Sequence, residues 1–84
     1  MFSLFSKPIK LDQALVDNLR LISEGFYAKH SADGMPKYYD IASEAIDLVK
    51  KLEQGLKHGR VKFVDWEERD AKRLLRAGKE FTNS

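Results

Sequence analysis

Apolar residues in the first third of the chain recur with the spacing of one face of an α-helix. Steps of three and four separate the large ones, which is the period of an amphipathic helix, and they are Leu11, Leu15, Leu19, Ile22 and Phe26. Asp12 lies at the start of this run, where a carboxylate can accept hydrogen bonds from the free amides of a first turn. The spacing predicts a helix over about residues 10–30, with Val16 and Tyr27 off its main apolar face.

A second apolar stripe predicts a longer helix over about residues 36–58. Alternating steps of four and three form a seam like that of a coiled coil, made of Tyr38, Ala42, Ala45, Val49, Leu52 and Leu56. Tyr39 and Ile46, which are seven residues apart, extend one edge of this seam. Gly34 marks a turn before the helix, and Pro36 suits its first position. Because this connection is short, the two helices should be antiparallel neighbours.

The last third of the chain predicts a linker and a third helix. Gly59 is a typical helix stop, and residues 60–64 then alternate charged with apolar side chains. This segment has the pattern of a short strand, which would need the Phe2–Phe5 segment or a second copy as its partner, and we favour an extended linker. Asp65 with Glu68 three residues on is typical of a capping box. The helix that follows should cover about residues 66–81, with an inner face of Ala71, Leu74, Leu75, Gly78 and Phe81.

These elements predict an all-α fold, a three-helix bundle with a central second helix and with Leu52 and Leu74 in its core. A chain of 84 residues is long enough for a single domain with one core. Residues 1–8 form a short apolar arm before the helices. We expect its Phe2, Leu4 and Phe5 to fold back onto the core, and the alternative is an arm that docks on a partner or another copy.

The start of the chain lacks the unbroken apolar run of a secretory signal, and no stretch reaches the roughly 18 apolar residues of a membrane span. We therefore expect a cytoplasmic protein that does not engage a membrane.

Candidate chemistry is sparse. The chain has no cysteine, which excludes disulfides, thiolate metal sites and cysteine nucleophiles. The five glycines are scattered and do not form a phosphate-binding loop. His30 and His58 lie at predicted helix ends, where a histidine usually complements the helix dipole or faces solvent. Glu67 and Glu68 fit the first turn of a helix. We expect no catalytic, cofactor-binding or metal-binding site, and no enzyme.

Charge is distributed unevenly along the chain. The net charge is only +2, yet residues 57–79 carry eight lysines and arginines against four acidic residues. Four of these cations share the outer side of the predicted third helix: Arg69, Lys72, Arg73 and Arg76. Such a face contacts phosphates in nucleic-acid-binding proteins, and it is also the ordinary solvated side of an amphipathic helix.

Aromatic residues favour a different partner. Tyr27 and Tyr39 lie off the main stripes of two helices that share a turn, and exposed tyrosine beside apolar residues suits protein interfaces. We interpret the chain as a small protein-binding module that occupies a surface of a larger protein, as an inhibitor or regulator. Its apolar anchors would be Val16, Tyr27, Tyr39 and Ile46. The other partner-binding candidate is the basic outer face of Arg69, Lys72, Arg73 and Arg76, which would dock on an acidic protein. The alternative interpretation of Tyr27 and Tyr39 is internal packing against the third helix or the arm. The alternative function is a nucleic-acid-associated protein that uses the basic face. The wide spread of apolar positions also predicts a homodimer.

Overall fold

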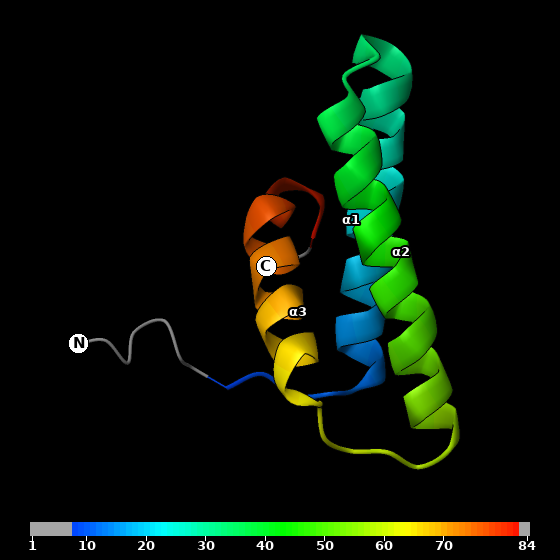
Figure 1. Ribbon diagram of the computed structural model, residues 1–84, viewed down its shortest axis with the longest axis vertical. Helices are drawn as coiled ribbons and strands as arrows, with labels where there is room; N and C mark the ends of the chain where they lie inside the picture. The colour runs from blue at the N-terminus through cyan, green and yellow to red at the C-terminus, as the bar shows by residue number, and fades with distance from the viewer. Residues whose placement is uncertain (1–7, 83–84) are drawn as a thin grey trace, which may run out of the picture.

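The computed structural model describes residues 8–82 and contains three α-helices and a final turn of 3-10 helix. They are α1 (Gln13–Asp33), α2 (Pro36–Lys57), α3 (Asp65–Ala77) and η2 (Lys79–Phe81). Figure 1 shows α1 and α2 as a long antiparallel hairpin, with the shorter α3 beside part of its length. No strand occurs among residues 8–82. The all-α three-helix prediction is confirmed, whereas the proposed positions of Phe2, Leu4 and Phe5 lie outside the described residues.

Both ends of α1 are set by the residues that flank it. The Asp12 side chain accepts a hydrogen bond from the Leu15 amide at 2.9 Å and so caps the first turn. At the other end Gly34 has a φ of 72°, a left-handed conformation that favours glycine, and its N–H donates to the His30 carbonyl. The helix therefore begins and ends a few residues later than the apolar spacing alone predicts.

The end of α2 is a Schellman motif, in which the last carbonyls of the helix are satisfied by the chain that turns back. Gly59 has a φ of 84° and donates to the Leu56 carbonyl at 3.0 Å. Arg60 donates its backbone N–H to the Gly55 carbonyl at 2.8 Å. The prediction that Gly59 stops this helix is confirmed. Residues 60–64 then run to α3 outside any helix or strand, as the linker interpretation expects.

The predicted capping box at Asp65 and Glu68 is wrong by one residue. Val64 is the N-cap of α3, and its N–H donates to the Glu67 carboxylate at 3.1 Å while the Glu67 N–H donates to the Val64 carbonyl at 3.0 Å. The register moves because Arg60 also donates two hydrogen bonds to the Glu67 carboxylate, at 2.9 and 3.2 Å, and holds it inward. Glu68 instead accepts from the Ile9 N–H at 3.3 Å and ties the start of the described chain to α3.

The core lies between α1 and α2 and extends under α3. Leu52 and Leu74 are almost completely buried, which confirms their predicted place in the core. Ala42 and Ala45 are fully buried, and their small size lets α1 and α2 approach closely enough for the Ser23 hydroxyl to donate to the Ala42 carbonyl at 2.9 Å. Burial of this hydroxyl is tolerated because it is hydrogen-bonded.

Two glycines allow the C-terminal part of the chain to lie directly on α1. The Phe81 ring lies on Gly25, at the position that a side chain there would occupy. At Gly78 a Cβ atom would come within 2.6 Å of the Ile22 side chain. The predicted inner-face positions Gly78 and Phe81 therefore do face the core, although α3 itself ends at Ala77 and Phe81 belongs to η2.

Candidate functional site

One face of the α1–α2 hairpin is not covered by α3 or η2. On α1, Ile22, Gly25, Phe26 and Lys29 contact this C-terminal part. On α2, Glu44 pairs with Arg73 and Lys51 lies over Trp66. At roughly 100° per residue, Tyr27 lies roughly 140–160° around α1 from Ile22 and Gly25. Tyr39 and Ile46 lie at the same angles around α2 from Glu44. We call this opposite side of the hairpin the uncovered face.

An aromatic pair occupies the turn end of the uncovered face. The rings of Tyr27 and Tyr39 meet edge to face with their centroids 5.6 Å apart, and the His30 ring lies 5.4 Å from that of Tyr39. Tyr39 is 50% exposed, and Tyr27 is partly buried. The two predicted anchors are therefore brought together, and each packs on the other across the hairpin.

The other two predicted apolar anchors differ from each other. Ile46 is partly buried against the core and lies on the uncovered face. Val16 has an exposed fraction of 0%, so its prediction as a partner-binding residue is wrong. The side of α1 that carries Val16 and Ser23 is the side that α2 covers, and the close approach at Ala42 and Ala45 leaves no room for a partner there.

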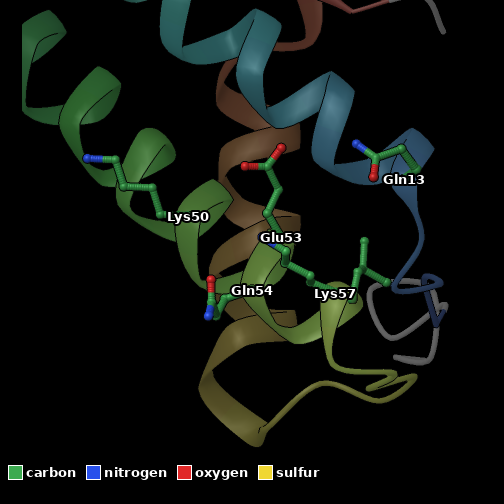
Figure 2. A pocket seen from close by; sticks show the side chains of 6 residues that line it. Gln13, Lys50, Glu53, Gln54 and Lys57 are labelled. Carbon is green, nitrogen blue, oxygen red and sulfur yellow. The ribbon is translucent and has the colours of Figure 1, made fainter.

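The uncovered face becomes polar toward the start of α1. Arg20 and Glu53 form an ion pair between α1 and α2. Beyond it lies an open pocket of about 580 Å³ lined by Gln13, Lys50, Glu53, Gln54, Leu56 and Lys57. Figure 2 shows Gln13 and Lys50 on opposite sides of this pocket with Glu53 between them. The sequence interpretation missed this pocket, although Lys50, Glu53 and Lys57 continue the helical spacing that begins at Tyr39 and Ile46.

The basic side chains of α3 are partly neutralised. Arg73 forms ion pairs with Glu44 at 3.0 Å and with Asp70 at 3.8 Å. Lys72 lies 3.5 Å from Glu68. Arg69 and Arg76 are exposed. The four predicted cations therefore do not form one continuous positive stripe, because carboxylates of α2 and α3 lie among them.

Comparison with protein families, curated proteins and solved structures gives no match to this chain. Within residues 8–82, no group of three or more histidine or acidic side chains is arranged to hold a metal ion. None of the helices in this described range combines the length and apolar character that a membrane crossing requires. The surface of the protein is thus the basis for a functional assignment.

Proposed function

We propose that this chain is a small, non-enzymatic protein-binding module of the cytoplasm. It acts by occupying a surface of a larger protein with the uncovered face of the hairpin, as an inhibitor or regulator. The observation that carries the proposal is the Tyr27–Tyr39 pair, which lies on a face that α3 and η2 leave open.

The chemistry of the pair supports a protein partner. A tyrosine buries a large apolar ring on binding while its hydroxyl stays hydrated or hydrogen-bonded, and tyrosine is enriched among the residues that dominate binding energy. The Tyr27 and Tyr39 rings already restrain each other, since each packs edge to face on its neighbour. Association therefore costs less side-chain entropy than it would for two free rings.

The polar end of the uncovered face supports specificity. Lys50 and Lys57 line the pocket beside Gln13, and amines and amides at an interface rim fix the register of a partner and accelerate its encounter. The Glu53 carboxylate is already engaged by Arg20, so it does not cancel both lysines. The uncovered face thus changes from aromatic at the turn end to basic at the other end. It fits a partner that has an apolar patch next to acidic groups.

The alternative, a nucleic-acid-associated protein that uses the outer side of α3, has less support. Lys72 and Arg73 lie against carboxylates, and a phosphate backbone would have to compete with them. Arg69 and Arg76 alone offer a small electrostatic contact.

The test is affinity capture from the extract of the native cells with the immobilised full chain, with and without nuclease. We expect a protein partner that survives nuclease treatment and is lost by the variant Tyr39→Ala, because truncating an anchor of this kind costs about 2 kcal/mol or more of binding energy. Val61→Ala is the matched control, since Val61 is a highly exposed apolar residue in the linker. A partner that Tyr39→Ala retains, or that nuclease releases, would contradict the proposal.

Self-association is a separate expectation. The open aromatic pair is apolar enough to pair with its own copy, and we expect a homodimer at high micromolar concentration. Light scattering should then report about twice the chain mass of 9.7 kDa, and Tyr39→Ala should shift the particle toward one chain mass. If the wild-type protein has the mass of one chain at that concentration, the expectation of a homodimer is wrong.

A further inference from the structure

A second surface, distinct from the Tyr27–Tyr39 pair, surrounds Trp66 at the start of α3. The Trp66 side chain is 39% exposed. It lies in a shallow depression of about 580 Å³ between the end of α2 and the start of α3, whose basic side is formed by Lys50, Lys51, His58 and Arg60. We call this depression the Trp66 groove.

The positive charge of the Trp66 groove is only partly compensated. Arg60 is committed to the Glu67 carboxylate, which is 4% exposed and accepts two hydrogen bonds from it. For Lys50 and Lys51, no ion pair is found among the side chains that the structure describes. The Lys51 amine instead lies 4.6 Å from the centre of the Trp66 ring, a cation–π contact. Two ammonium groups beside an exposed indole therefore remain available to a ligand.

The opposite side of Trp66 has the reverse charge. A smaller hollow of about 170 Å³ lies there between α2 and α3, and its lining includes Glu44, Asp47 and Asp70. Arg73 pairs with Glu44 and Asp70, and Lys51 also borders this hollow, so three carboxylates face two cations and the lining keeps a net negative charge. Trp66 thus stands at a boundary between a basic and an acidic surface.

We propose that the Trp66 groove binds an acidic peptide segment of a partner protein. Carboxylates of the segment lie against Lys50, Lys51 and His58, and a large apolar side chain of the segment packs on the Trp66 ring. The site goes beyond the function proposed above, because it uses the α2–α3 side of the molecule and neither tyrosine of the aromatic pair, although Lys50 and Gln54 border both this groove and the pocket of the uncovered face.

The charge boundary at Trp66 favours a peptide over a nucleic acid. A nucleic-acid backbone carries a negative charge at every nucleotide, so a strand that stacked a base on Trp66 and continued past it would meet the net negative lining of the hollow at Asp47. In a peptide the side-chain charge varies from residue to residue, so the acidic residues of the segment can stop where it reaches Trp66.

The experiment begins with selection of a random peptide library on the immobilised full chain. We expect the enriched peptides to combine several aspartates or glutamates with a large apolar residue. Trp66 is the single tryptophan of the chain, so its fluorescence reports this site directly. Titration with a synthetic enriched peptide should change that fluorescence saturably, and the affinity should fall with added salt because exposed charges are screened.

Charge variants of α2 then locate the site. Lys51→Glu should weaken peptide binding by about tenfold or more, and Lys51→Gln should weaken it less. Lys37→Glu makes the same charge change at the other end of α2 and should leave the affinity within about twofold. Circular dichroism confirms that each variant is folded. Tyr39→Ala should bind the peptide normally, so failure of this site and failure of the Tyr27–Tyr39 interface are distinguishable.

Four results would overturn the assignment. They are a selection that enriches no acidic sequences, equal binding of a peptide with lysines in place of the acidic residues, equal loss in Lys37→Glu and Lys51→Glu, and displacement of the peptide by an oligothymidine that binds more tightly. The last result would reassign the Trp66 groove to single-stranded nucleic acid.

Discussion

The two ends of the hairpin differ in the chemistry of their contacts. At the turn end aromatic rings pack on each other: Phe26 contacts Tyr38 and Phe81, and Tyr27 contacts Tyr39. At the end where α2 passes into α3, directed polar contacts hold the linker and the start of α3, namely the Schellman motif at Gly59 and the Arg60–Glu67–Val64 hydrogen bonds. Aromatic packing tolerates small displacements, whereas a buried carboxylate needs each of its donors in place.

This difference separates a surface that is open to a partner from one that fixes the chain. Tyr39 is half exposed and contacts the Tyr27 and His30 rings, so a partner can reach it without breaking a directed hydrogen bond. If the Glu67 carboxylate moved away, the Arg60 guanidinium and the Val64 N–H would both lose their hydrogen-bond acceptor. Trp66 directly precedes Glu67, so these hydrogen bonds lie beside the Trp66 groove.

The largest effects should come from the core that the two ends share. Leu52→Ala or Leu74→Ala removes a nearly fully buried side chain and should lower the free energy of unfolding by about 2–5 kcal/mol. Urea denaturation followed by circular dichroism measures the change. If neither variant shifts the midpoint, the described inner faces of α2 and α3 are incorrect.

Glu67→Gln should be the most damaging change at the polar end. It removes the charge that receives two hydrogen bonds from Arg60 and should cost about 1.5–3 kcal/mol, the range for hydrogen bonds to charged groups. The neighbouring Glu68→Gln is the matched control, because Glu68 is more exposed and its ion pair with Lys72 should contribute about 1 kcal/mol or less. Equal losses in the two variants would mean that Glu67 does not organise this end.

Tyr39→Ala should affect folding less than Glu67→Gln does. Tyr39 loses its edge-to-face contacts with Tyr27 and His30, a single aromatic pair is worth about 0.5–1.5 kcal/mol, and half of the Tyr39 side chain is already in water. Thermal unfolding checks the value. A loss as large as that of Leu74→Ala would show that Tyr39 supports the fold more than it serves an interface.

The smallest effect on folding is expected on the outer side of α3. Arg76→Glu should lower the free energy of unfolding by about 1 kcal/mol or less, because it reverses a charge in the last turn of α3, and Arg73→Glu should act similarly, because it loses the exposed ion pairs with Glu44 and Asp70. Binding of duplex and single-stranded DNA at low salt tests whether this side of α3 also contacts nucleic acid. Affinity that falls steeply with salt and disappears in the double variant would restore the nucleic-acid alternative.

The helices were predictable because their signals are local. Each of these signals acts on residues only a few positions away. They are the apolar residues at steps of three and four, the Asp12 N-cap, and the helix stops at Gly34 and Gly59. The cap of α3 was predicted one residue too late, since the contact that decides it comes from Arg60 in the preceding linker.

The candidate sites depended on contacts between elements, and there the sequence was less informative. The pairing of Tyr27 with Tyr39 follows from the short turn between two regular helices. Val16 was assigned to the wrong surface because periodicity gives an angle around α1 and does not say where α2 lies. The approach of Lys51 to Trp66 depends on how α3 packs on α2, and no spacing in the chain encodes it.

Replacing Gly25 by alanine should have opposite effects on the helix propensity of α1 and on the stability of the intact protein. Within a helix, alanine is favoured over glycine by about 1 kcal/mol, so Gly25→Ala should make an isolated α1 peptide more helical. In the intact protein the added methyl group would displace the Phe81 ring from α1 and weaken the attachment of η2. Gly25 thus lowers the local helix propensity of α1 and allows the long-range contact with Phe81. A stability ranking based on helix propensity alone would choose alanine at position 25, which is the wrong residue for the intact protein.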